Sequence, residues 1–98
     1  MTINASQNEN KIIISPIGRL DSATSGEFME FIDANFTEEF SELEIDFSGV
    51  DFISSKGLRV IVSQHKNLNG RKMVLTHCNE SVHEVFRLSG LLNILDIK

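Results

Sequence analysis

Two adjacent serines, Ser54 and Ser55, stand where a strand-like run ends and a helix-like run begins. A serine hydroxyl at a helix start accepts a hydrogen bond from a free backbone N–H and so caps the helix. The same place offers unpaired N–H groups and the positive end of the helix dipole, which together hold a phosphoryl group without unfolding the chain. The pair therefore has two interpretations, a helix cap and an acceptor for a protein kinase.

The residues that follow the pair weaken the purely structural interpretation. One cap needs one hydroxyl, so a second hydroxyl is left over. Gly57 lies in the first helical turn, where glycine costs roughly 1 kcal/mol relative to alanine. We expect this glycine to clear space above the helix start for the backbone of a second protein. A phosphate on the free serine adds about −1.5 to −2 charges at pH 7, so it would act at a docking surface rather than in the core.

No other pattern of catalytic or metal-binding residues stands out in the sequence. The chain has no phosphate-binding glycine loop and no nucleophile elbow, and His83-Glu84 does not continue into a zinc-protease motif. The spacing of His65, His77 and Cys78 does not match a zinc finger. We expect Cys78 to be a small apolar residue near a strand end and His65 to be a partly buried packing residue. The sequence predicts no enzymatic activity, no metal and no cofactor.

Length and composition indicate one globular domain over residues 1–98, with 41% hydrophobic and 23% charged residues. The formal net charge of −5 and the lack of a basic run argue against nucleic acid as a partner. A single cysteine is typical of a reducing compartment. The polar amino terminus does not resemble a secretion signal, and no apolar run exceeds three residues, so we predict a cytoplasmic protein without membrane insertion.

The hydrophobic spacing predicts alternating strands and helices, and hence an α/β fold with a partly parallel sheet and helices mainly on one face. Strands are expected at residues 2–7, 12–20, 43–47, 73–75 and 94–97, the second with a break near Pro16. Helices are expected after Thr24, Ser55 and Ser81. The middle helix is expected to bury one stripe of residues: Leu58, Ile61, Val62, His65 and Leu68.

The first and third of these helices each follow a capping-box pattern. In Thr24-Ser25-Gly26-Glu27 and Ser81-Val82-His83-Glu84, the first hydroxyl would cap the helix and the glutamate would return to the backbone. The serine pair has no such returning glutamate. We therefore expect a division of labour, with Ser54 nearer the cap and Ser55 exposed.

The sequence resembles the STAS domains, and among them the bacterial anti-sigma factor antagonists. The resemblance covers almost the whole chain, and its middle motif is specific in combination. It rests on residues 18–21 (Gly-Arg-Leu-Asp), 45–50 (Ile-Asp-Phe-Ser-Gly-Val) with 52–58 (Phe-Ile-Ser-Ser-Lys-Gly-Leu), and 88–91 (Leu-Ser-Gly-Leu). It implies a single STAS domain with a mixed four- to five-stranded sheet.

The resemblance also implies a regulatory function. A member of this family binds an anti-sigma factor, which is a serine kinase of the GHKL type, and so releases a sigma factor. The kinase phosphorylates a serine at a helix start and inactivates the antagonist, and a metal-dependent serine phosphatase reverses the reaction. Alignment on Gly57-Leu58 places the phosphorylated position at Ser55, with Ser54 as the alternative acceptor. Asp21 matches an acidic family residue in partner recognition, although it also suits a turn before Thr24.

Lys56 departs from the family pattern, which usually has a small residue there. A cation in the first turn opposes the helix dipole, yet it could pair with a neighbouring phosphate or hinder the kinase. The alternative function is a STAS scaffold or transport-complex subunit in which the serine is not used. For the antagonist, the expected partner-binding residues are Asp21, Ser22, Thr24, Ser54, Ser55, Lys56, Gly57, Leu58 and Arg59.

Overall fold

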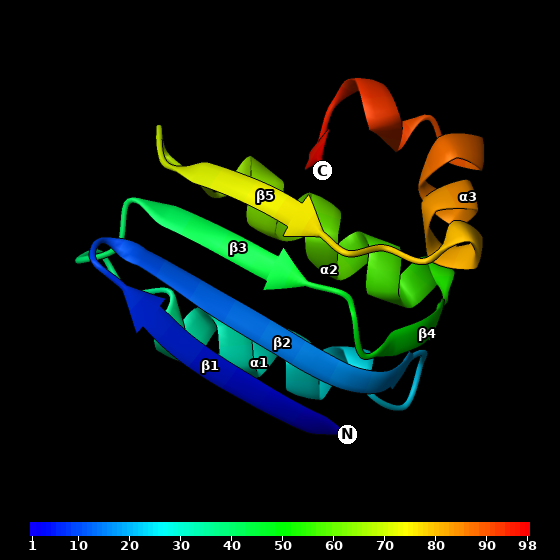
Figure 1. The fold of residues 1–98 in the computed structure, drawn as a ribbon, viewed down its shortest axis with the longest axis horizontal. Coiled ribbons are helices and arrows are strands. Elements are labelled where there is room, and N and C mark those ends of the chain that lie inside the picture. Colours follow the sequence, from blue (N-terminus) through cyan, green and yellow to red (C-terminus); the bar gives the residue numbers. More distant parts are fainter.

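The computed structural model describes residues Met1–Lys98 and begins with a β-hairpin (Figure 1). Strand β1 (Thr2–Asn8) runs antiparallel to β2 (Lys11–Leu20). The turn between them places Glu9 in the left-handed region at φ 58°, as suits a tight hairpin. The expected first strand and turn are confirmed.

The rest of the sheet is parallel to β2. Strands β3 (Glu42–Asp46), β5 (Lys72–Thr76) and β6 (Asp96–Ile97) continue the order β1-β2-β3-β5-β6. A sixth strand, β4 (Val50–Ile53), pairs with the far end of β2. The mixed sheet of an α/β fold is therefore confirmed, and β4 is a strand that was not among those predicted from the sequence.

The expected break near Pro16 is wrong as a break, because β2 runs through it. Instead β2 changes its parallel partner there: residues 11–14 pair with β3 and residues 18–20 pair with β4, with a register shift between Gly18 and Arg19. Proline has no N–H to donate, so the gap between two partners is where a sheet tolerates it.

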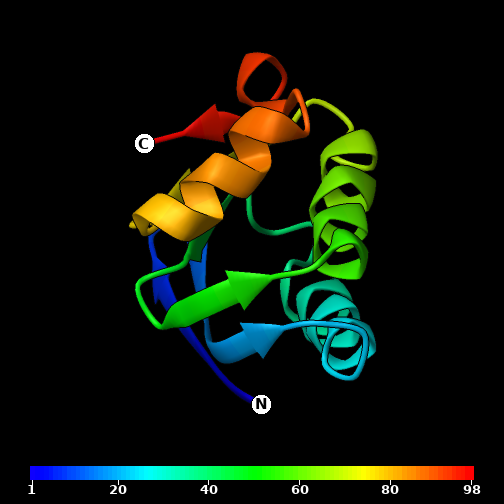
Figure 2. The same cartoon turned by 90° about the vertical axis from the view of Figure 1, so that its right-hand side faces the viewer.

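Two helices cover one face of the sheet and lie side by side (Figures 1 and 2). They are α1 (Ser25–Asn35) and α2 (Ser55–Lys66). Helix α3 (Glu80–Leu88) packs against β4 at the end of the sheet, and a short 3-10 helix, η1 (Leu91–Asn93), leads to β6. None of the helices combines the length and the apolar character needed to cross a bilayer.

The core lies between the sheet and the helices and is built around aromatic side chains. Phe28, Phe47 and Phe86 are fully buried, and the rings of Phe47 and Phe86 meet edge to face with centroids 6.0 Å apart. On α2 the buried face differs from the expected stripe. His65 is half-buried, as expected of a packing residue, but Val62 is only half-buried as well, and the buried residues of this helix are Gly57, Val60, Ile61 and Gln64.

Both capping boxes are wrong. Thr24 is at the N-cap of α1, but its hydroxyl donates to the Arg19 carbonyl at 2.6 Å and caps no helix N–H, and Glu27 lies 3.5 Å from the Met1 amino group. Helix α3 starts one residue before Ser81, because the Asn79 side chain accepts from the Val82 N–H at 2.8 Å. An asparagine two residues upstream competes successfully for the cap.

Candidate functional site

The two serines at the start of α2 have separate positions. Ser54 is the N-cap: its Oγ accepts from the Gly57 N–H at 3.3 Å, and its own N–H donates to the Leu20 carbonyl at 2.8 Å. Ser55 is the first helical residue and is exposed, and its hydroxyl makes no hydrogen bond within the protein. The expected division between a capping Ser54 and an exposed Ser55 is confirmed.

Gly57 does not face a partner, which corrects the expectation that it clears space above the helix. It is buried, and a Cβ built on it would lie 2.8 Å from Ile53 Cγ1 and 3.0 Å from the Leu20 carbonyl oxygen. The glycine lets the first turn of α2 lie directly against the ends of β2 and β4. Its contribution to the site is to position Ser54 and Ser55.

Asp21 closes a tight turn beside this helix start. Its Oδ1 accepts from the N–H groups of Ala23 at 3.0 Å and Thr24 at 3.2 Å. Partial desolvation raises the pKa of Asp21, but these two N–H groups, the Thr24 hydroxyl and the Arg19 guanidinium together lower it below its ordinary value. The carboxylate is thus held ionised within a rigid turn.

The turn and the helix start are adjacent because they follow neighbouring strands. Leu20 ends β2 and precedes Asp21, and its carbonyl accepts the Ser54 N–H. A shallow groove between α1 and α2 brings three of the expected partner-binding residues together: Ser22, Lys56 and Arg59. Thr24 is half-buried with its hydroxyl bonded to Arg19, and Leu58 is half-buried toward the core.

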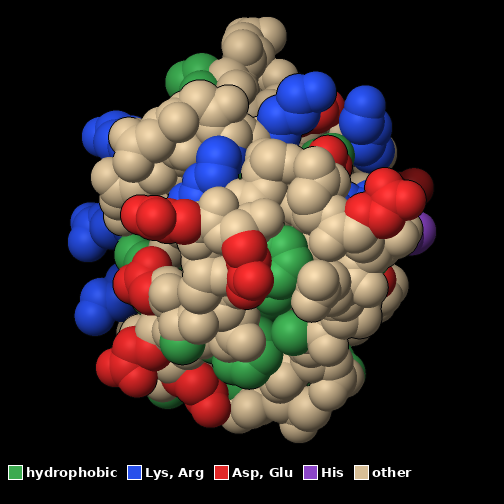
Figure 3. Space-filling model, turned by 90° about the vertical axis from the view of Figure 1, so that its left-hand side faces the viewer, with side chains coloured by type: hydrophobic (Ala, Val, Ile, Leu, Met, Phe, Trp, Pro, Cys, Tyr) green, Lys and Arg blue, Asp and Glu red, His purple; other side chains and the backbone are tan.

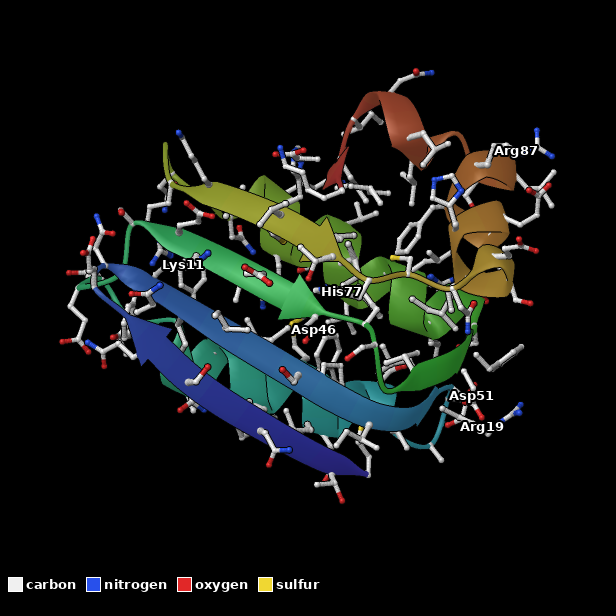
Figure 4. The ribbon with its side chains drawn as sticks, viewed as in Figure 1. Lys11, Arg19, Asp46, Asp51, His77 and Arg87 are labelled. Atoms are coloured by element: carbon white, nitrogen blue, oxygen red, sulfur yellow. The ribbon has the colours of Figure 1, made fainter.

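A surface pair of a cation and an aromatic ring, which the sequence did not predict, lies at the same end of the sheet. The Arg19 guanidinium lies over the Phe52 ring, 4.2 Å from its centroid, and Phe52 remains 39% exposed. Arg19 and Phe52 are register partners in β2 and β4, and Figure 4 shows Arg19 at this edge near Asp51. Alternation along the strand gave only a weak signal, because β4 buries Val50 and Ile53 and leaves both Asp51 and Phe52 exposed.

The remaining reactive side chains do not form a second centre. Burial raises the pKa of the Cys78 thiol to about 11, so it carries little thiolate near neutral pH. His77 Nδ1 lies 3.2 Å from the Asp46 carboxylate on the open face of the sheet (Figure 4). No three His, Cys, Asp or Glu side chains converge in the way that a metal ion requires.

Known proteins share both the sequence pattern and the fold. The family model described as the STAS domain matches residues 2–98. The anti-sigma-B factor antagonist of Listeria monocytogenes is 29% identical over 94 residues, which cover 94% of this chain and 82% of that protein.

Two solved structures show the same architecture at low identity. An anti-sigma factor antagonist from Mycobacterium paratuberculosis has a TM-score of 0.91 at 21% identity and covers 98% of this chain and 83% of that one. The Bacillus cell fate determinant SpoIIAA in its phosphorylated form has a TM-score of 0.74 at 17% identity and covers 99% and 91%. At these identities the two structures bear on the fold alone.

Proposed function

This chain belongs to the STAS domain family, and we propose that it is an anti-sigma factor antagonist, a binding protein rather than an enzyme. It binds an anti-sigma factor, and the anti-sigma factor then releases its sigma factor. This activity requires a cytoplasmic location. The sequence similarity to an anti-sigma-B factor antagonist supports the class of partner. The exposed site on α2 supports the way in which binding is regulated.

The observation that carries the regulatory part is the free hydroxyl of Ser55. Ser54 already satisfies the cap, so phosphorylation of Ser55 leaves the hydrogen bond to the Gly57 N–H intact. A GHKL-type kinase, the anti-sigma factor itself, would transfer the γ-phosphoryl group of ATP to Ser55 Oγ and release ADP. The new phosphate lies at the positive end of the α2 dipole, where the helix tolerates it.

The switch then works at the docking surface rather than through the core. The proposed surface comprises Asp21, Ser22, Ser55, Lys56 and Arg59, together with the newly found pair of Arg19 and Phe52. A phosphate adds bulk and about −1.5 to −2 charges in the middle of this surface, which opposes binding of the kinase. A metal-dependent serine phosphatase restores the unmodified, binding-competent form.

Phosphopeptide mapping after incubation with ATP and the anti-sigma factor kinase of the same genome tests this proposal. We expect one phosphate, on Ser55, and none in the Ser55→Ala variant, which keeps its affinity for the kinase. Modification of Ser54 beside an unmodified Ser55 would overturn the assignment. A kinase that neither binds nor modifies the chain would overturn the function.

Lys56 favours a second candidate, a non-enzymatic scaffold or transport-complex subunit with an unused serine. Its side chain is exposed directly after Ser55, where the family usually has a small residue, and it could obstruct a kinase. Neighbouring genes for a kinase and a sigma factor support the antagonist, whereas a transporter operon supports the scaffold.

A further inference from the structure

Helix α2 has a charge opposite to that of the protein as a whole. It contains Lys56, Arg59 and Lys66 and no acidic residue, although the chain has a formal net charge of −5. All three cations are exposed, and none forms an ion pair. Asp33 reaches α2 from α1, but its carboxylate accepts from the Gln64 amide at 2.8 Å. The positive charge of this helix is therefore available to a partner.

The three cations form a line along the outer side of the helix. Lys56 and Arg59 are one turn apart, and Lys66 is two turns beyond Arg59, with Ser63 between them. The line spans roughly 15 Å, because a helix rises 1.5 Å per residue. We call Lys56, Arg59, Ser63 and Lys66 the α2 stripe.

An apolar groove runs beside the stripe, between α2 and the segment that follows α3. Its apolar lining consists of three half-buried side chains, Leu58, Val62 and Leu91. Polar and cationic residues complete it: Arg59, Ser63, Lys66 and Ser89. The hollow has a volume of about 440 Å³ and no acidic residue lines it. Three members of the stripe, Arg59, Ser63 and Lys66, are thus also groove residues.

Helix α1 beside α2 carries Glu27, Glu30 and Asp33, but other acidic side chains lie away from the groove. The end of the molecule where β1 turns into β2 displays several of them around exposed hydrophobic side chains (Figure 3). A hollow between β1, β2 and the end of α1 is lined by Ile12, Phe40 and Glu39, among others. The α2 stripe and its groove are therefore a local group of cations without a lining carboxylate, on a chain whose formal net charge is −5.

We propose that the α2 stripe and its groove bind an acidic amphipathic helix of a protein partner, with leucine-like side chains in the groove and carboxylates on Arg59 and Lys66. This inference rests on the proposed function, since it names the chemistry that the anti-sigma factor presents to α2. An amphipathic helix laid in an apolar groove is a general mode of peptide recognition. Cations at the rim of the groove orient the acidic partner helix and raise its rate of association with the protein.

Nucleic acid fits this surface less well, although it is also acidic. Its affinity depends on many phosphate contacts, and three cations on a protein of net charge −5 provide few of them. A phosphate backbone would also leave the lining of Leu58, Val62 and Leu91 without an apolar partner. An acidic helix satisfies the cations and the apolar lining at once.

The stripe also connects the groove with the proposed phosphorylation site. Lys56 and Arg59 are the first two cations of the stripe. Ser55 directly precedes Lys56 and lies one helical turn before Arg59. A phosphate on Ser55 would neutralise both and lower the attraction for an acidic partner. Phosphorylation thus weakens the electrostatic part of binding and leaves the apolar part unchanged.

A synthetic peptide tests the chemistry without any kinase. The probe is an acetylated, amidated helix of about 15 residues with leucines on one face and glutamates beside them. It is titrated into isotope-labelled protein and followed by the amide NMR signals. We expect shifts confined to α2 and residues 89–91. Lys66→Glu should raise the Kd about three- to tenfold, because one attraction becomes a repulsion.

Lys72→Glu is the matched control, since Lys72 is also exposed and unpaired but belongs to β5. An equal loss in both variants would overturn the proposal, as would equal binding of a peptide with lysine in place of glutamate. Shifts of α2 with protein concentration alone would assign the groove to a second copy. Tighter binding of an oligonucleotide than of the peptide would assign it to nucleic acid. A failure of Ser55 to be phosphorylated leaves the peptide result standing, so the two proposals fail separately.

Discussion

The backbone N–H of Ser54 donates to the carbonyl of Leu20 at 2.8 Å, and this bond ties the start of α2 to the end of β2. The same carbonyl oxygen would lie 3.0 Å from a Cβ at Gly57. The Leu20 carbonyl therefore fixes the position of the start of α2 and also restricts position 57 to glycine. The geometry of the exposed Ser55 depends on this contact, because Ser55 lies between the two.

Gly57→Ala should destabilise the protein even though alanine is the better helix former. The gain in helix propensity is about 1 kcal/mol, while the new methyl group would overlap Ile53 and the immobile Leu20 carbonyl. Such overpacking costs about 1–3 kcal/mol, so we expect a net loss. Urea unfolding measures it. Gly26→Ala in α1 is the control: no atom lies within 4 Å of its added Cβ, and it should be neutral or stabilising.

Ser54→Ala and Ser55→Ala should separate the structural serine from the regulatory one. Loss of the Ser54 cap should lower the free energy of unfolding by about 1 kcal/mol. Ser55→Ala removes a hydroxyl that bonds nothing within the protein, so its unfolding curve should match that of the wild type. A larger loss for Ser55→Ala than for Ser54→Ala would reverse the assignment of the cap.

The secondary structure was predictable from the sequence where it depends on residues close together in the chain. The alternation at residues 43–47 predicted the strand that the structure has as β3. Gly90, at φ 74°, follows the end of α3 in the left-handed region that glycine favours. Leu91, the next residue, is partly buried and packs against the core. The sequence also separated the roles of Ser54 and Ser55 from their neighbours alone.

The errors arose where a distant element decides the outcome. The buried face of α2 is rotated from its apolar stripe because Gly57 must meet Leu20, a residue far away in sequence. Gln64 is buried because Asp33 on another helix pairs with it. Asn79, rather than Ser81, is the N-cap of α3. Strand β4 forms by pairing with the end of β2 that β3 does not reach. These are tertiary effects that spacing does not encode.

Asp21 should contribute to stability in a pH-dependent way. Its folded-state pKa is lowered overall: desolvation raises it, but hydrogen bonds from Ala23 and Thr24 and the charge of Arg19 lower it more. A lowered carboxyl pKa adds stability above the pKa of the unfolded chain, and this stability is lost as the pH falls through the folded-state pKa. We expect Asp21→Asn to reduce the dependence of unfolding on pH in the acid range. If the free energy of unfolding fell with acid pH equally in Asp21→Asn and in the wild type, Asp21 would not be a source of this pH dependence.

Cys78 should react slowly with alkylating reagents. Burial raises its pKa to about 11, so thiolate, the nucleophilic form, is scarce at neutral pH. The rate of modification by iodoacetamide should rise when the protein is unfolded in urea, which restores an ordinary thiol pKa and full access. Equal rates in the folded and unfolded protein would show that Cys78 is neither buried nor shifted.

Ser55→Glu should weaken binding of the anti-sigma factor kinase at least tenfold, or about 1.4 kcal/mol, if a negative charge at this position opposes the partner. Because the effect is electrostatic, it should shrink as added salt shortens the Debye length. Surface plasmon resonance at several salt concentrations measures both quantities. Ser81→Glu is the matched control, since Ser81 is an exposed serine in the first turn of α3 and outside the proposed surface. Equal losses in the two variants would mean that binding responds to net charge alone and that Ser55 has no special place in it.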